Sequence, residues 1–262
     1  MMPSRTDLES LACQAGEILR AGFGKNQEVV FKGEIDPVTE VDRRSEVFLL
    51  REIRKRFPDD KIVTEESGVL NGSDCCVWYI DPLDGTVNYA HGIPIFAVSI
   101  AYGEKGALRL GVVYDPLRDE CFSAELGMGA WLNGERIAVA QTTELIQSLF
   151  VTGFPYDIRA NPENNLDHFA RFSLLTQGVR RLGAATLDLC YVAAGRFDGY
   201  WEKGLFPWDI AAGVLIAQEA GAKVTDIQGG PVQLAPSCSV IAANPCLHAQ
   251  MLDVLRGRER DE

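Results

Sequence analysis

The order of predicted strands and helices changes along the chain, and this change limits the possible fold more than any other feature. Before about residue 145, short apolar runs follow one another, most of them bounded by Gly, Pro or Asp, which predicts consecutive strands at 61–64, 77–80, 96–102 and 108–114. After it, helical patterns near 163–177, 184–194, 208–220 and 245–256 alternate with apolar strands near 149–153, 197–201, 223–226 and 238–243. We therefore predict a mixed α/β (α+β) body. It forms one domain over residues 1–262, with possible subdomains at 1–145 and 146–262.

Two amphipathic helices and a hairpin are predicted in the first part. Apolar residues recur at helical spacing in two segments, the first ending near Gly22 and Gly24 and the second stopped by Pro58. Their apolar faces comprise Leu8, Leu11, Ala12, Ala15, Ile18 and Leu19 in the first, and Val41, Phe48, Leu49, Ile53 and Phe57 in the second. The segment 127–137 contains Asn133-Gly134, which is typical of a two-residue hairpin turn.

The composition is that of an ordinary globular protein with an acidic surface. Hydrophobic residues make up 47% of the 262 and charged residues 24%, which excludes disordered, collagen-like and coiled-coil chains. The formal net charge of −12 argues against a general binder of nucleic acid or anionic membranes, because both need a basic face. We therefore expect neither a membrane nor a nucleic acid as partner.

The cysteines, the histidines and the N-terminus indicate a cytoplasmic protein. Seven cysteines without a C-x-x-C pair are typical of free thiols in a reducing compartment. The three histidines lack partners four residues away, so a zinc site of the usual kind is not expected. The N-terminus has no apolar region typical of a signal peptide, and the apolar stretch 93–102 is too short to span a bilayer.

Acidic residues cluster at the ends of predicted strands and the starts of predicted helices, where ligand sites of open α/β sheets gather. The sharpest cluster, Asp81-Pro82-Leu83-Asp84-Gly85-Thr86, directly follows the strand at 77–80. Three more clusters occur: Thr64-Glu65-Glu66-Ser67 after another strand, Trp208-Asp209 at a helix start after Pro207, and Asp36, Thr39 and Asp42 before the second helix.

Each cluster also has a purely structural explanation. Asp81 to Gly85 fits a common Asp-Pro turn closed by glycine, and the Glu65-Glu66 pair fits a solvated turn. Asp209 fits the first turn of a helix, and Thr39 with Asp42 fits a capping box. The functional interpretation depends on the four clusters occurring together and in this order.

Carboxylates combined with a backbone carbonyl are hard oxygen ligands, which suit Mg²⁺ or Mn²⁺ rather than zinc. If a helix begins at Thr86, the backbone N–H groups of Gly85 and Thr86 would form an anion site. An acidic protein can bind an anion there, because bound cations invert the local field. The sequence therefore predicts a site for a divalent cation and a phosphate group.

Together these motifs resemble the inositol monophosphatase family, within the lithium-sensitive, magnesium-dependent phosphatase superfamily. Order and spacing agree across nearly the whole chain, and the similarity is greatest to the bacterial inositol-1-monophosphatase branch. The matching segments are Asp36 to Asp42, Glu65 to Ser67, Asp81 to Asn88, 183–189, 198–202 and Pro207 to Ala212. The resemblance implies a layered αβαβα sandwich of the inositol monophosphatase and fructose-1,6-bisphosphatase type, and a homodimer.

The resemblance also implies a role for each matching residue. It places one Mg²⁺ on Glu65, Asp81 and the Leu83 carbonyl, a second on Asp81, Asp84 and Asp209, and a third, weaker ion on Glu65 and water. The phosphate contacts the N–H groups of Gly85 and Thr86, and the inositol hydroxyls contact Asp84, Ala185 and Glu202. Arg180 matches a substrate-region arginine of bacterial relatives, although Arg180 and Arg181 also fit surface charges. The implied substrate-binding set is Glu65, Leu83, Asp84, Gly85, Thr86, Arg180, Ala185, Glu202 and Asp209.

The reaction that the resemblance implies is hydrolysis of a phosphate monoester, foremost myo-inositol 1-phosphate, without a phosphoenzyme. Glu65 and Thr86 accept the proton of the attacking water, and Asp42 orients the Thr86 hydroxyl. The cation on Asp209 stabilises the leaving alkoxide. Lithium inhibits by displacing magnesium. Phe206 departs from the animal enzymes, which leaves the choice of alcohol open.

Several alternatives stay open. Within the family, fructose 1,6-bisphosphate, histidinol phosphate, 3′-phosphoadenosine 5′-phosphate and NADP compete as substrates, although Glu202 favours inositol phosphate. Some bacterial relatives bind the transcription apparatus, which is a different class of function. A covalent haloacid dehalogenase site is disfavoured because two residues, not one, separate Asp81 from Asp84. Walker, dinucleotide and G-x-S-x-G motifs are missing from the sequence.

Overall fold

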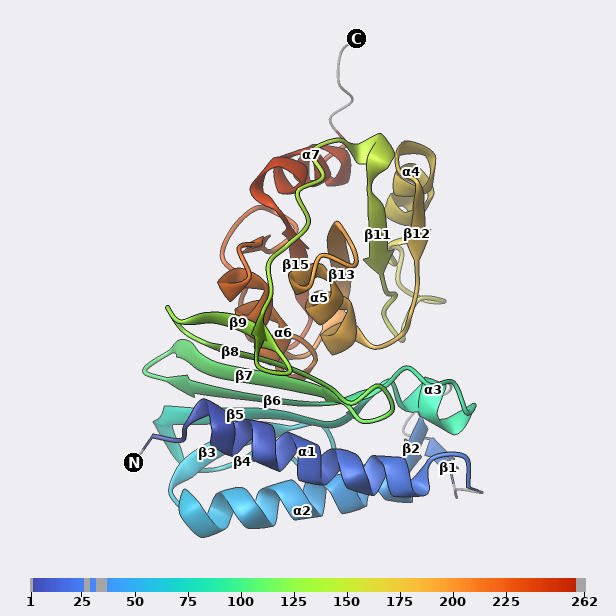
Figure 1. Cartoon of the computed structure of the whole chain (residues 1–262). Helices are drawn as coiled ribbons and strands as arrows, with labels where there is room; N and C mark the ends of the chain where they lie inside the picture. The colour runs from blue at the N-terminus through green and yellow to red at the C-terminus, as the bar shows by residue number, and fades with distance from the viewer. Residues whose placement is uncertain (1, 26–28, 32–36, 258–262) are drawn as a thin grey trace.

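Two β-sheets with helices between them and on their outer faces make up the fold (Figure 1). The computed structural model describes residues 2–25, 29–31 and 37–257, so Asp36 of the first acidic motif lies outside the described residues. The outer layer on one side is α1 (Arg5–Gly22) and α2 (Glu40–Arg56), and on the other α4 (Leu166–Leu175) and α7 (Pro245–Leu255). Between the sheets lie α5 (Ala185–Ala193) and α6 (Pro207–Glu219). The predicted αβαβα sandwich is confirmed.

The first sheet has eight strands in the order β10-β9-β8-β7-β6-β5-β3-β4. All neighbours in it are antiparallel except β3 and β5, which are parallel. Its strands are β3 (Asp60–Thr64), β4 (Gly68–Leu70), β5 (Ser73–Asp84), β6 (Ala97–Glu104), β7 (Ala107–Asp115), β8 (Glu120–Glu125), β9 (Gly129–Leu132) and β10 (Glu135–Arg136). A separate two-stranded ladder pairs β1 (Val29–Phe31) with β2 (Pro37–Thr39).

The second sheet has five strands in the order β12-β11-β13-β15-β14. The strand β11 runs parallel to β12 and β13, whereas β15 is antiparallel to β13 and β14. The strands are β11 (Leu149–Thr152), β12 (Gly178–Arg180), β13 (Gly199–Leu205), β14 (Lys223–Thr225) and β15 (Cys238–Ala243). A short 3-10 turn, Leu145–Gln147, precedes β11. The division into subdomains at 145 stays a prediction.

Helix starts and the hairpin follow the predicted local chemistry. The helix α1 begins at a capping box in which the Ser4 N–H donates to Asp7 Oδ2 at 2.8 Å and the Asp7 N–H donates to Ser4 Oγ at 3.2 Å. The helix α2 begins at the predicted box of Thr39 and Asp42. Asn133 and Gly134 have φ values of 50° and 83°, as a two-residue turn between β9 and β10 requires. The predicted α2 capping box and hairpin turn are confirmed, whereas the α1 box was not predicted.

Other elements differ from the prediction. The strand β5 was expected to end at Ile80, but it continues to Asp84 because, after an irregularity in register, Asp84 pairs with Ala97 of β6. The strand β8 was not predicted. Its alternation is obscured because Ser123 is buried and donates to Glu9 Oε1 of α1 at 2.7 Å.

The core is continuous across the middle layer. Most of α6 is buried, because the helix packs against the first sheet on one side and the second on the other. A Cβ at Gly111 of β7 would lie 2.9 Å from the Ala212 carbonyl, so this strand and α6 approach closely only because residue 111 is glycine. Across the described part of the chain, no helix combines the length and the apolar character needed to cross a membrane.

A buried histidine near the C-terminus makes stability dependent on pH. His248 of α7 is fully buried, its Nε2 lies 2.9 Å from Thr225 Oγ1, and its Nδ1 has no hydrogen-bond partner. Burial, together with the positive charge of the nearby Lys223, lowers the pKa of His248 from 6.5 to about 4. Because the unfolded chain takes up this proton more readily, the contribution of His248 is present above pH 6.5 and is lost as the pH falls toward 4.

We therefore expect His248→Gln to reduce the pH dependence of stability. Between pH 7.5 and pH 4.5, the free energy of unfolding of the native chain should lose about 2.5 kcal/mol more than that of the variant. Urea unfolding of both proteins at the two pH values measures this difference. Equal losses in the two proteins would contradict the assignment.

Candidate active site

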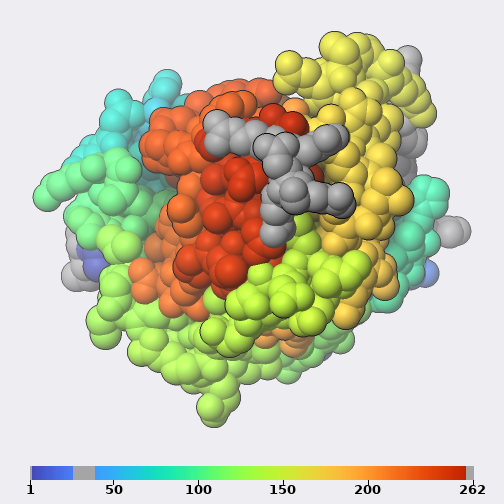
Figure 2. All heavy atoms as spheres, turned by 90° about the horizontal axis from the view of Figure 1, so that it is seen from above, coloured from blue at the N-terminus to red at the C-terminus, as the bar shows by residue number. Residues whose placement is uncertain are grey.

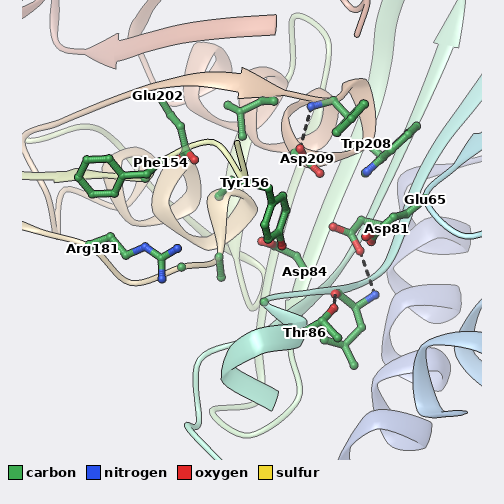
Figure 3. A pocket seen from close by; sticks show the side chains of 18 residues that line it. Glu65, Asp81, Asp84, Thr86, Phe154, Tyr156, Arg181, Glu202, Trp208 and Asp209 are labelled. Carbon is green, nitrogen blue, oxygen red and sulfur yellow. Dashed lines mark hydrogen bonds between the residues drawn. The ribbon is translucent and has the colours of Figure 1, made fainter. Parts of the chain in front are cut away.

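A cavity of about 330 Å³ opens between the two sheets (Figure 3). It is lined from the first sheet by the segment after β3 and the end of β5, and from the second by β13 and the segment after β11. The starts of α3 (Thr86–Ala90), α5 and α6 complete it. The lining residues are Glu65, Asp81, Leu83, Asp84, Gly85, Thr86, Gly153, Phe154, Tyr156, Arg181, Gly183, Ala184, Ala185, Glu202, Leu205, Phe206, Trp208 and Asp209.

Most of the predicted site residues meet in this cavity. The exceptions are Asp42, which lies behind Thr86 rather than on the wall, and Arg180, whose exposed side chain belongs to β12. The adjacent Arg181 lines the cavity instead, and Figure 3 shows it with Phe154 on the side away from Glu65 and Asp81.

Each of the three aspartates of the cavity accepts a hydrogen bond from a backbone N–H group. Asp81 Oδ1 accepts from the Leu83 N–H at 3.0 Å, and Asp84 Oδ2 accepts from the Thr186 N–H at 2.8 Å. Asp209 Oδ2 accepts from the Phe206 N–H at 2.7 Å, so this carboxylate also caps α6. A carboxylate accepts through both of its oxygens, so these hydrogen bonds do not exhaust its capacity to bind a ligand.

Burial and mutual repulsion disfavour the charged forms of these acids. Burial raises the pKa of Asp81 well above its ordinary value, and the neighbouring carboxylates of the cavity raise it further. Burial also raises the pKa of Asp209, against the hydrogen bond from Phe206. The pKa of Asp84 rises to about 6 through burial, although its hydrogen bonds to Thr186 oppose the rise. A bound cation would relieve both the burial cost and the repulsion.

The donors suit a hard divalent cation, because the cavity wall offers carboxylate and carbonyl oxygens but no His or Cys among its lining residues. Within the described ranges, no three His, Cys, Asp or Glu side chains are grouped closely enough to form a metal site. The acids therefore face one cavity without converging on one point. Closer ligation requires side-chain adjustment around the ion.

Thr86 at the cavity wall is oriented by the carboxylate of Asp42, which lies behind it. Thr86 Oγ1 lies 3.0 Å from Asp42 Oδ1 and 3.0 Å from the Leu83 carbonyl, so its single proton can be donated to either. Asp42 Oδ2 accepts from the Thr39 N–H at 2.9 Å. Asp42 thus caps α2 with one oxygen and orients Thr86 with the other. Burial raises the pKa of Asp42.

Local backbone geometry explains two glycines of the wall. Gly85 has a φ of 90° and a Cβ there would lie 2.9 Å from the Ile95 carbonyl, so only glycine allows the turn that starts α3 at Thr86. A Cβ on Gly153 would lie 2.2 Å from both carboxylate oxygens of Glu202. Glu202 therefore occupies its position because residue 153 has no side chain.

Glu202 is the acid on the second sheet. It is buried in β13, and its Oε2 accepts from the Tyr200 hydroxyl at 2.7 Å. Burial raises the pKa of Glu202 to about 7, while the Tyr200 hydrogen bond and the positive charge of Arg181 lower it. Figure 3 shows Glu202 and Asp209 reaching the cavity from neighbouring elements.

Two aromatic residues of the wall, Phe154 and Tyr156, were not predicted from the sequence. They follow β11, and the available signal was Gly153 and Pro155 at the end of that strand. The Phe206 and Trp208 rings are stacked with centroids 4.8 Å apart and planes 3° apart. Arg181 was considered only as a surface charge.

The fold and the cavity define the class: an αβαβα protein with an acidic, oxygen-lined site between its sheets. A sequence model of the inositol monophosphatase family matches residues 4–259. Inositol-1-monophosphatase from Synechocystis sp. is 44% identical over 244 residues, covering 92% of this chain and 84% of that protein. Nus factor SuhB from Pasteurella multocida is 43% identical over 258 residues, covering 96% of this chain and 95% of that protein.

Solved structures agree with this assignment. The inositol monophosphatase from Anabaena (Nostoc) sp. has a TM-score of 0.88 to this chain at 43% identity, covering 97% of this chain and 95% of that one. The chain belongs to the inositol monophosphatase family. Family membership supports a phosphatase activity, and the family is generally metal-dependent.

The contact between Gly153 and Glu202 predicts the effect of adding one methyl group. Gly153→Ala should lower the free energy of unfolding by about 1–3 kcal/mol, because the new Cβ displaces the buried carboxylate. In a Glu202→Ala background the same change should cost less than about 0.5 kcal/mol. Urea unfolding of the four proteins measures the cycle.

Gly103→Ala in β6 is the matched control, because a Cβ there meets no atom closer than 3.4 Å. If Gly153→Ala costs the same with and without the Glu202 side chain, the contact does not position Glu202.

Proposed function

We propose that this chain is a Mg²⁺-dependent phosphatase that hydrolyses a phosphate monoester, with myo-inositol 1-phosphate as the foremost substrate. The observation that carries the proposal is the group of four carboxylates, Glu65, Asp81, Asp84 and Asp209, facing one cavity beside the start of α3. The name of the Synechocystis relative supports the substrate. Fructose 1,6-bisphosphate, histidinol phosphate, 3′-phosphoadenosine 5′-phosphate and NADP are the alternatives.

Two or three Mg²⁺ ions, or Mn²⁺ in their place, would be held by Glu65, Asp81, the Leu83 carbonyl, Asp84 and Asp209. Bound there, the ions would supply positive charge against the phosphate and acidify a water molecule. The backbone N–H groups of Gly85 and Thr86 would bind phosphate oxygens. The net charge of −12 does not oppose this, because the ions invert the field within the cavity.

In the proposed reaction, Thr86 and Glu65 would accept the proton of the attacking water. When Thr86 Oγ1 donates a hydrogen bond to Asp42 Oδ1 at 3.0 Å, its lone pairs can accept a hydrogen bond from water. A proton that passed from this water to Thr86 Oγ1 would require the Thr86 hydroxyl proton to move on to Asp42 Oδ1. Glu65 is the second acceptor. Lithium would inhibit by competing with magnesium for the same carboxylates.

The alcohol side of the substrate would contact Glu202, Asp84 and Ala185. Glu202 is suited to accept hydrogen bonds from hydroxyl groups, because Gly153 leaves space for it and Tyr200 fixes one of its oxygens. For the predicted substrate-region arginine, the geometry favours Arg181 over Arg180, since only Arg181 lines the cavity.

Phosphate release from a substrate panel tests the proposal. The panel holds myo-inositol 1-phosphate, fructose 1,6-bisphosphate, histidinol phosphate and 3′-phosphoadenosine 5′-phosphate, each with Mg²⁺, with EDTA and with added lithium. We expect turnover that requires Mg²⁺, is inhibited by lithium and is fastest with inositol phosphate. A different leading ester would overturn the substrate, and no release from any ester would overturn the activity.

Removing one cavity charge should abolish turnover without unfolding the chain. Asp81→Asn should lower kcat/KM at least about 100-fold and weaken Mg²⁺ binding, because it removes a proposed ligand of two ions. Its unfolding temperature in EDTA should not fall, since a repelled, buried charge is lost. Asp74→Asn, an exposed acid of β5, is the control. Full activity of Asp81→Asn at low Mg²⁺ would contradict the metal assignment.

We also propose a homodimer, as expected from the family resemblance. Three leucines of α4 are exposed, with exposed fractions of 49% for Leu166, 85% for Leu174 and 41% for Leu175. Figure 2 shows the yellow region that includes α4 beside the red α7 on one face of the molecule. Contiguous exposed apolar patches commonly mark contacts with other proteins, and we propose that these leucines lie in the dimer interface.

Leu174→Lys should convert the dimer to a monomer, because it places a charge in the proposed interface. Light scattering coupled to gel filtration would report the mass. Val47→Lys alters an exposed apolar residue of α2, on the opposite side of the molecule, and should leave the mass unchanged. A native chain that is monomeric at micromolar concentration would refute the proposed dimer.

A role in transcription is the second candidate, and the relatives named Nus factor SuhB favour it. The acidity of the chain argues against direct contact with RNA, so a protein component would be the partner. A pull-down with RNA polymerase components at increasing salt tests it. Binding by Asp81→Asn equal to that of the native chain would separate this role from catalysis. We expect either role to be exercised in the cytoplasm.

A further inference from the structure

The buried face of α2 reaches three separate segments of the cavity wall. Asp42, Ser45 and Glu46 are each less than 5% exposed and lie on one side of the helix, since residues three and four apart are neighbours on its surface. Each forms a hydrogen bond with a different segment. Asp42 accepts from Thr86 at the start of α3, and Ser45 donates to the end of β5. Glu46 accepts hydrogen bonds from the end of β3 and the residues that follow it. One rigid helix therefore contacts every part of the site that the first sheet supplies.

The contacts of Glu46 enclose Glu65 on both sides along the chain. Glu46 Oε2 accepts from Thr64 Oγ1 at 2.9 Å and from the Glu66 N–H at 3.0 Å. Its Oε1 accepts from the Ser67 hydroxyl. The residues immediately before and after Glu65 are thus fixed by one carboxylate, which determines the direction in which the Glu65 side chain leaves the backbone.

The neighbouring bond of Ser45 fixes the second acidic segment to the same helix. Ser45 Oγ donates to the Pro82 carbonyl at 2.9 Å, between Asp81 and Leu83. The distance between the Glu65 segment and the Asp81 segment is therefore set through adjacent residues of α2, in addition to the parallel pairing of β3 with β5.

We propose that Glu46 is a positioning residue for Glu65, and that it tunes the affinity of the cavity for divalent cations. This inference rests on the proposed function only in taking Glu65 as a cation ligand. Glu46 lines no part of the cavity and touches neither ion nor substrate. Outer carboxylates that orient a ligand segment commonly change metal affinity 10- to 100-fold when removed.

The three hydrogen bonds that Glu46 accepts predict which substitution of Glu46 is tolerated. Every partner of Glu46 donates, so a carboxylate, which only accepts, matches all three. In Glu46→Gln, the amide oxygen can replace Oε2, and the amide NH₂ then faces the Ser67 hydroxyl, which can rotate to accept. Glu46→Ala loses all three bonds and leaves the buried Thr64 hydroxyl and the Glu66 N–H without their acceptor.

Direct Mn²⁺ binding, followed by electron paramagnetic resonance of the free ion, tests the inference without an activity assay. We expect the Mn²⁺ Kd to rise about 10- to 100-fold in Glu46→Ala and less than about 5-fold in Glu46→Gln. Glu52→Ala, on the same helix but outside these bonds, should leave Kd unchanged. In turnover, saturating Mg²⁺ should restore kcat of Glu46→Ala to within about 3-fold of native, because a positioning defect acts on metal affinity.

Ser67→Ala keeps the test decisive if Glu46→Ala does not fold, because Ser67 is exposed and contributes one of the three bonds. It should raise the Mn²⁺ Kd about 2- to 5-fold. Unchanged Mn²⁺ affinity in folded Glu46→Ala, or in Ser67→Ala where Glu46→Ala does not fold, would overturn the inference and leave the proposed function intact. A native chain that binds no Mn²⁺ would overturn both.

Discussion

Repulsion among buried carboxylates is the constraint on which the rest of the site depends. Four acids share one cavity, and the pKa values of Asp81, Asp84 and Asp209 are all raised. Such an arrangement persists only where the fold holds each acid in place at a free-energy cost. Backbone N–H groups next to β5 and at the starts of α5 and α6 provide that restraint. The strand and helix ends around the cavity thus serve as fixed dipoles against negative charge.

The layered architecture explains why acids from different elements face one cavity. Glu65 and Asp81 come from parallel strands of the first sheet, and Asp209 comes from a helix buried between the sheets. Small residues let these layers approach, as the contact of Gly111 with the Ala212 carbonyl shows. Packing between the layers therefore sets the size of the cavity. Core mutations far from the cavity can change its width for the same reason.

Much of the fold followed from local sequence signals. The capping box of Thr39 and Asp42, the Asn133-Gly134 turn and the alternating elements after residue 145 were predictable, because turn chemistry and apolar period are local properties. The extension of β5 was not, since it depends on pairing of Asp84 with Ala97, 13 positions further along the chain. The strand β8 was missed because its inward polar residue, Ser123, pairs with α1.

The site was predictable to a similar degree. Motif spacing identified the acids, but it could not distinguish Arg180 from Arg181. Adjacent side chains of an extended chain point in opposite directions, and which of the two points toward the cavity depends on how β12 pairs with its neighbour. Phe154 and Tyr156 carry no motif, and only the folded chain brings them to the cavity. The structural and proposed functional explanations of Asp42 and Asp209 do not exclude each other. Asp42 caps α2 with one oxygen and contacts Thr86 with the other, and Asp209 accepts from the Phe206 N–H while lining the cavity.

Asp42 and Asp209 each serve both a helix cap and the proposed site, and this double role affects how related sequences diverge. A lineage that abandons catalysis while keeping its fold is free to lose Glu65 or Asp81, which cap no helix. Loss of Asp42 or Asp209 would also remove a cap from α2 or α6, so selection for a folded protein alone retains both. Their presence in a related sequence is therefore weak evidence of turnover. If Glu65 and Asp81 hold cations as proposed, they are the informative positions for separating active descendants from those kept for binding alone.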